Sequence, residues 1–170
     1  MAGGVRSVVV GVDPDVDRSG VARLDLGDGA RLELSSLTFA ELLHFLLAAR
    51  DEAARSGLGL TVVVEAGWLN RGNWHVRWSD TNRLACAKGY NVGRNHEAGR
   101  KIVELARGLG IQVAEARPLR KPWRGRDGKI TREELAWFTG YAGRSTQDAR
   151  DAALLAWTHA GLPVVVKPRM

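Results

Sequence analysis

Four acidic residues stand where their side chains could together hold a divalent cation. Asp13 follows the apolar run 8–12, and Glu65 follows the valines at 62–64. A carboxylate at the end of a buried strand has to be hydrogen-bonded, ion-paired or bound to a cation, because burying it alone is costly. Each acid also has an ordinary structural explanation: a turn before Pro14 for Asp13, and an ion pair with an arginine for Glu65.

The other two acids, Asp148 and Asp151, are three residues apart in a segment with helical periodicity. Residues at this spacing share one helical face. Asp148 fits a capping box that starts at Ser145, and a first-turn acid is favoured by the helix dipole. Asp151 lies about a turn further in, where two like charges on one face repel unless a cation lies between them. A structural role therefore explains Asp151 least well.

Carboxylate oxygens from two strand ends and one helix face form a set of hard ligands that suits Mg²⁺, with Mn²⁺ as a substitute. We expect two ions, because a pair about 3.5–4 Å apart activates a water and stabilises the leaving oxygen in phosphodiester hydrolysis. The run that begins at Asp13 also starts like a calcium-binding EF-hand loop. That motif requires Gly and Glu where this chain has Arg18 and Leu24, which excludes it.

The elements that position these acids follow from apolar periodicity and turn residues. We expect strands at 7–13, 20–26, 30–34, 60–65 and 111–115, and helices at 38–56, 96–109, 131–138 and 146–160. The segments 66–90 and 118–129 are expected to be irregular. This order predicts an α/β fold, a mixed five-stranded sheet flanked by helices, in which strand carboxyl ends form the site. A chain of 170 residues fits one domain, 1–170.

Charge points to a polyanionic partner. The chain has 25 Lys and Arg against 19 Asp and Glu, a net charge of +6, with the basic residues concentrated in 71–107 and 117–129. A solvated basic surface is the alternative. The single cysteine, Cys86, excludes an internal disulfide and is expected to be buried. No apolar stretch approaches the roughly 20 residues of a membrane span, and no signal peptide is visible, so we expect a cytoplasmic protein without a membrane partner.

Aromatic and basic residues alternate directly after Glu65, as in proteins that bind unpaired or distorted DNA. Packing in the core or in a dimer interface is the alternative. The segment 91–96 is expected to precede a helix and to offer backbone N–H groups to a phosphate, or to cap that helix. A basic, glycine-containing loop follows at 118–129. The residues expected to contact DNA are Trp68, Arg71, Trp74, His75, Arg77, Trp78, Arg94, Lys121, Arg124, Arg126 and Lys129.

Three short motifs carry a family resemblance: Gly-Val-Asp-Pro at 11–14 with Ser-Gly at 19–20, Val-Val-Val-Glu at 62–65, and Gln-Asp-Ala-Arg-Asp-Ala-Ala-Leu-Leu-Ala at 147–156. With these motifs the chain resembles the RuvC-like Holliday junction resolvases of the RNase H-like superfamily, from residue 8 to residue 160. The resemblance implies an RNase H-like fold, a homodimer, and paired Mg²⁺-dependent nicks across a four-way DNA junction. It also places the four acids on the metal-binding positions of that family.

The sequence therefore predicts a structure-specific DNA endonuclease. Asp13, Glu65 and Asp151 are expected to bind metal directly, and Asp148 to act as a fourth ligand or to orient water. One alternative is an RNase H-like nuclease that cleaves RNA–DNA hybrid or flap DNA. A second is a nucleic-acid-binding module without catalysis. A sugar kinase or actin-like ATPase needs two such domains, which 170 residues cannot hold.

Overall fold

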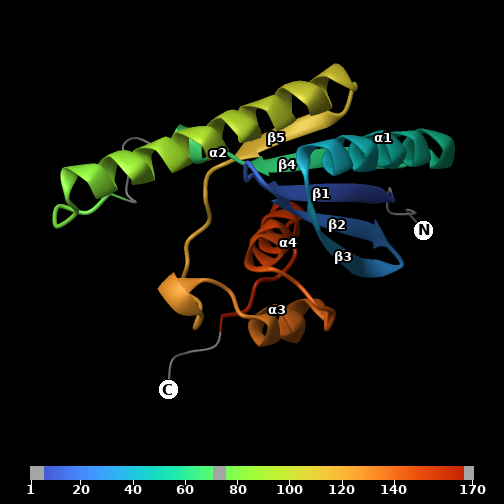
Figure 1. Ribbon diagram of the computed structural model, residues 1–170. Helices are drawn as coiled ribbons and strands as arrows, with labels where there is room; N and C mark the ends of the chain where they lie inside the picture. Colours follow the sequence, from blue (N-terminus) through green and yellow to red (C-terminus); the bar gives the residue numbers. More distant parts are fainter. Residues whose placement is uncertain (1–5, 71–75, 167–170) are drawn as a thin grey trace.

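The computed structural model describes residues 6–70 and 76–166. Its centre is a five-stranded sheet in the order β3-β2-β1-β4-β5 (Figure 1). The strands are β1 (Ser7–Asp13), β2 (Ser19–Gly27), β3 (Gly29–Leu37), β4 (Gly59–Glu65) and β5 (Gln112–Ala116). The first three strands pair antiparallel, whereas β4 runs parallel to β1 and β5 parallel to β4. The predicted α/β class, a mixed five-stranded sheet flanked by helices, is confirmed.

Helices cover both faces of the sheet, because side chains alternate along a buried strand. Val8, Val10 and Val12 of β1 pack with α1 (Phe39–Ser56) and the C-terminal half of α2 (Asn82–Gly108). On the other face, Val9 packs against α4 (Gln147–His159), and α3 (Arg132–Thr139) lies beyond it. Figure 1 shows α1 and α2 above the sheet and α4 and α3 below it.

Helix α2 is much longer than expected. It begins after Thr81, whose side chain accepts a hydrogen bond from the Leu84 backbone N–H, so the prediction of an irregular segment up to residue 90 is wrong from residue 82 onward. The buried residues of α2 all lie at Gly99 or later. The first half therefore lacks the apolar periodicity by which a helix is recognised. It extends away from the sheet, which is also why Cys86 is exposed rather than buried (Figure 1).

The same finding corrects the expected phosphate site at 91–96. This segment lies inside α2 and not at its start, so its backbone N–H groups are used within the helix. Two smaller differences concern boundaries. Strand β3 continues to Leu37, and α4 is capped by Thr146, whose side chain accepts from the Ala149 N–H, rather than by Ser145. Within the described ranges, no helix has both the length and the apolar character that a membrane span requires.

Candidate active site

Three of the four acids meet at one point. Asp13, Asp148 and Asp151 each place one carboxylate oxygen so that the three oxygens lie within 4.8 Å of one another. Asp13 ends β1, while Asp148 and Asp151 lie one turn apart near the start of α4. A side chain from the central strand and two from the helix packed on it thus converge.

Glu65 joins them from the neighbouring strand. β1 and β4 run parallel with Val12 beside Val64, so Asp13 and Glu65 end adjacent strands at the same edge of the sheet. All four acids line one cleft of about 730 Å³. Within residues 6–70 and 76–166 Glu65 forms no salt bridge, so the ion-pair explanation considered for it finds no support there.

Two glycines let α4 come close enough. A Cβ on Gly20 would lie 2.1 Å from the Asp148 carbonyl oxygen, and one on Gly11 would lie 2.2 Å from the Ala152 carbonyl oxygen. Gly20 is also the residue of β2 that pairs with Asp13. The backbone of α4 therefore rests directly on β1, which carries Asp13, and on its neighbour β2, and this brings Asp148 and Asp151 to Asp13.

The electrostatics of the cluster favour a cation. Burial, and then the charges of Glu65, Asp151 and Asp148, raise the pKa of Asp13 well above its usual range, against an opposing effect of Lys129. Burial likewise raises the pKa of Glu65 and that of Asp148. Gathered carboxylates resist ionising together, and a divalent cation relieves both their mutual repulsion and their desolvation. Their hard oxygen donors fit Mg²⁺ or Mn²⁺.

Asp151 is oriented by its own helix. The Gln147 side-chain amide donates to Asp151 Oδ1 over 2.9 Å and to the Ile130 carbonyl over 3.2 Å. Lys129 Nζ lies 3.8 Å from Asp151 Oδ2. Asp148 is not needed as a helix cap, because Thr146 has that role. Both α4 acids therefore point toward Asp13 with little of their hydrogen-bonding capacity used in the fold.

The basic loop provides one wall of the cleft. Arg120, Lys121 and Lys129 line it, while Arg124 and Arg126 are exposed and are not among its lining residues. The loop is anchored: Trp123 is buried and stacks on Phe138 with ring centroids 5.9 Å apart. The same set of acids thus faces lysines that can neutralise phosphate charge.

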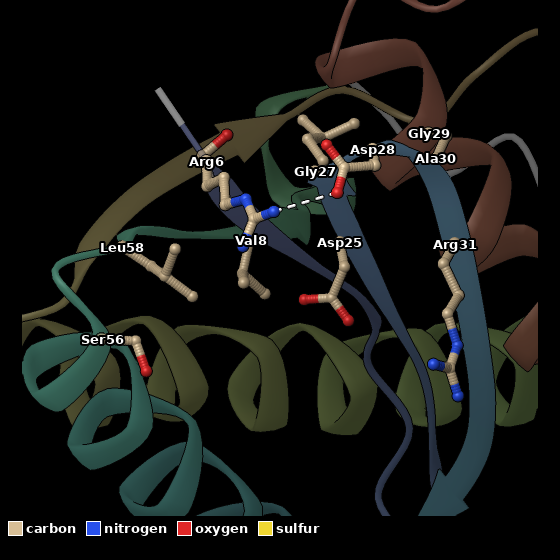
Figure 2. A pocket seen from close by; sticks show the side chains of 12 residues that line it. Arg6, Val8, Asp25, Gly27, Asp28, Gly29, Ala30, Arg31, Ser56 and Leu58 are labelled. Carbon is tan, nitrogen blue, oxygen red and sulfur yellow. Dashed lines mark hydrogen bonds and ion pairs between the residues drawn. The ribbon is translucent and has the colours of Figure 1, made fainter. Parts of the chain in front are cut away.

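A second hollow, of about 540 Å³, lies at the opposite end of the sheet. Figure 2 shows its lining, in which Arg6 forms an ion pair with Asp28 over 3.0 Å and Asp25 and Arg31 lie nearby. Basic and acidic side chains alternate there without a cluster of one sign. Among the described residues, the acid-lined cleft is therefore the better candidate for chemistry.

No family model matches the chain, and no curated protein matches it. Two solved structures that it does match are Thermus thermophilus RuvC in complex with a Holliday junction substrate and Thermus thermophilus RuvC itself. The first is 21% identical, with 91% of this chain and 92% of that chain covered and a TM-score of 0.46. The second is 22% identical, with 90% and 93% covered and a TM-score of 0.44. At these identities the likeness concerns the fold alone.

The structure places the residues of the tryptophan-rich segment in different surroundings. Trp68 lines the cleft but is held by the protein: its Nε1 donates to Glu115 Oε2 over 3.1 Å, and the Arg100 guanidinium lies 5.7 Å from its ring centroid. Trp78 is fully exposed in a turn before α2, beside exposed Arg77, and neither lines the cleft. Three further expected DNA contacts lie outside the described residues: Arg71, Trp74 and His75.

Arg94 is not brought to the acids. Val92 of α2 lines the cleft, and two residues along a helix turn the side chain by about 200°, so Arg94 lies on the far face. Its guanidinium is over the Tyr90 ring, 5.6 Å from the centroid. Sequence reasoning in turn missed several residues of the cleft: Asp15, Asn95, His96 and Arg120. Asp15 could have been recognised from the sequence, as an extra acid two residues after Asp13, whereas no sequence pattern pointed to Asn95.

Proposed function

We propose that this chain is a metal-dependent endodeoxyribonuclease that resolves four-way DNA junctions by paired nicks. The observation that supports this most strongly is the convergence of Asp13, Asp148 and Asp151 within 4.8 Å, with Glu65 in the same cleft. A half-buried acidic cluster facing a basic wall suits the hydrolysis of a phosphodiester, whose charge the wall can bind.

The proposed roles keep the assignment made from the sequence, although the geometry places Asp148 in the same cluster as Asp13 and Asp151. Asp13, Glu65 and Asp151 hold the metal directly, and Asp148 serves as a fourth ligand or orients water. When bound, Mg²⁺ or Mn²⁺ supplies an activated water and stabilises the leaving oxygen, with two ions expected. Gln147 holds Asp151 in place. Lys121 and Lys129 reduce repulsion between the acids and the incoming DNA backbone, and both lower the pKa of Glu65.

The four-way junction is the substrate that the sequence motifs imply. A two-fold homodimer would match it, because such a dimer places one active site on each of two symmetric strands. Arg77, Trp78, Arg124 and Arg126 would contact DNA outside the cleft. Sedimentation of the purified protein tests the dimer directly: a monomer at all micromolar concentrations would contradict it.

The decisive experiment compares substrates with and without Mg²⁺. A synthetic four-way junction, linear duplex, flap DNA and RNA–DNA hybrid are incubated with the protein, and symmetric nicks confined to the junction are expected. Cleavage of hybrid or flap alone would overturn the junction assignment, and binding without cleavage would overturn the enzymatic one.

Asp13→Asn links the activity to the site. This variant is expected to lose cleavage by at least 10²-fold, an order typical for loss of a catalytic electrostatic group, while it keeps junction binding. Asp28→Asn is the matched control, since Asp28 is an exposed acid at the other end of the sheet. Unchanged cleavage by Asp13→Asn would refute the assignment.

A further inference from the structure

Helix α2 contacts the loop that follows Asp13 through one side chain. Asn95 Oδ1 accepts a hydrogen bond from the Val16 backbone N–H over 3.2 Å, and Asn95 Nδ2 donates to Asp15 Oδ2, also over 3.2 Å. The two halves of this amide thus bind a backbone group and a carboxylate of the same loop. An amide can satisfy both because it carries a donor and an acceptor side by side.

Asp15 is committed to the fold, although it lines the cleft. Its Oδ1 accepts from the backbone N–H groups of Asp17, over 2.8 Å, and of Arg18, over 3.4 Å. Its Oδ2 accepts from Asn95, and its own N–H donates to Ser19 Oγ over 3.1 Å. Both carboxylate oxygens therefore hold the turn. In the described part of the chain the Asp13 carboxylate accepts no comparable set of hydrogen bonds, so its oxygens are available to a ligand.

The next turn of α2 contacts the loop that follows Glu65. A Cβ on Gly99 would lie 2.5 Å from Trp68 Cζ3 and 3.1 Å from Pro14 Cγ, so both loops close on this glycine. Trp68 belongs to the short 3-10 turn Gly67–Leu69 directly after β4. One turn of one helix, from Asn95 to Gly99, therefore touches the segments that leave both acid-bearing strands.

We propose that Asn95 is a positioning residue of the acidic site. Through Asp15 and Val16 it fixes the loop after Asp13 against α2, and Gly99 allows the loop after Glu65 to close on the same point. Asp15 is then an anchor of this clamp and not a metal ligand. The clamp holds the strand ends of Asp13 and Glu65 at one separation. Its effect on metal binding rests on the proposed function.

A single substitution and a charge-preserving double substitution together test the clamp. Asn95→Asp places a carboxylate against that of Asp15. We expect this variant to show faster amide hydrogen exchange at Val16 and at least fivefold weaker Mn²⁺ binding, measured by titration calorimetry. In Asp15→Asn/Asn95→Asp the donor and acceptor exchange places, and both readouts should return to within about twofold of wild type. A merely destabilising change at Asn95 would not be rescued by a second substitution.

Two controls use the same helix. Asn91→Asp introduces an equal charge one turn earlier at an exposed position and should leave both readouts unchanged. Gly99→Ala should weaken Mn²⁺ binding, whereas Gly93→Ala should not, because a Cβ on Gly93 meets no atom within 4 Å. Thermal melts of all variants establish that each is folded.

The outcomes separate the clamp from the nuclease. The clamp is refuted if Asn95→Asp changes neither readout. It is also refuted if Asp15→Asn alone weakens Mn²⁺ binding as much as Asp13→Asn does and the double substitution does not restore it, because Asp15 would then be a metal ligand. If wild type neither binds Mn²⁺ nor cleaves DNA while Val16 exchange is still restored by the double substitution, the nuclease proposal fails and the clamp stands.

Discussion

Gly20 of β2 and Asp148 of α4 meet backbone to backbone: the site of a Cβ on Gly20 lies 2.1 Å from both the carbonyl carbon and the carbonyl oxygen of Asp148. Gly20 also pairs with Asp13 across β1 and β2. Because Gly20 has no side chain, α4 can approach β1 closely enough to bring Asp148 and Asp151 to Asp13. Any residue other than glycine there must displace α4.

Gly20→Ala should consequently damage both the fold and the site. Overpacking of this kind costs about 1–3 kcal/mol, measurable by urea unfolding, and the shift of α4 should weaken Mn²⁺ binding at least fivefold. Gly59→Ala is the control, because a Cβ there meets only Ser7 Cβ at an ordinary 3.6 Å. Wild-type Mn²⁺ affinity in folded Gly20→Ala would contradict this account of how the acids are spaced.

Removal of one acid should stabilise the metal-free protein. Burial, and then the neighbouring carboxylates, raise the pKa of Asp13, so Asp13→Asn removes a charge that the fold disfavours. Without metal the variant should melt at a higher temperature than wild type. With Mg²⁺ at 100 times its dissociation constant, wild type should gain about 2.7 kcal/mol and the variant much less. A lower melting temperature of metal-free Asp13→Asn would count against a repulsive cluster.

The same pKa shifts give a pH dependence with a definite sign. Asp13, Glu65 and Asp148 bind protons more tightly in the folded state, so their contribution to stability is present below the ordinary pKa values of about 4 and is lost as the pH rises through the raised ones. Glu41, Glu52 and Asp80 have lowered pKa values and act oppositely.

A comparison between variants isolates the cluster. Without metal, the free energy of unfolding of wild type relative to Asp13→Asn/Glu65→Gln should fall from pH 5 to pH 8. Saturating Mg²⁺ should remove or reverse that trend, because the cation binds the deprotonated acids. Chemical denaturation at several pH values measures this, and a relative stability that rises with pH without metal would contradict the assignment.

What the sequence could predict depended on burial. The strand ends at Asp13 and Glu65 followed from apolar runs, and the shared face of Asp148 and Asp151 from their spacing. The first half of α2 was missed because an exposed helix has no apolar period to read. Asn95 was missed for another reason: its partners, Asp15 and Val16, are far away in the sequence, and only the packing of α2 brings them together.

Lys129 should influence both the proton affinity of the acids and DNA binding. It lowers the pKa of Asp13, Glu65 and Asp148, so Lys129→Met should move the acid limb of the pH–rate profile upward. If Lys129 also contacts a phosphate, Lys129→Met should reduce the slope of the logarithm of the junction-binding constant against the logarithm of the salt concentration by about one. Lys129→Arg should restore both. In Arg126→Met, whose side chain is 96% exposed, the acid limb should stay in place.

Trp78 offers the sharpest test of DNA contact outside the cleft. It is fully exposed, yet its turn is fixed: Asp80 Oδ2 accepts from the Arg77 N–H and from Lys88 Nζ, each over 2.7 Å. A tryptophan presented in this way beside an exposed arginine, Arg77, suits an unpaired base. Trp78→Ala should weaken junction binding by about 1–3 kcal/mol, the usual contribution of one stacked base, and change the stability by less than about 0.5 kcal/mol.

Fluorescence anisotropy with a labelled junction measures this loss, and Trp137→Ala is the matched control. Trp137 is half-exposed, whereas Trp78 is fully exposed, and it lies on α3 below the sheet, where no base contact is proposed (Figure 1). Sedimentation of both variants distinguishes a second explanation. If Trp78→Ala turns a dimer into a monomer, the tryptophan belongs to the subunit interface, and any loss of affinity would follow from that. Unchanged affinity in a Trp78→Ala dimer would remove Trp78 from the DNA-binding surface altogether.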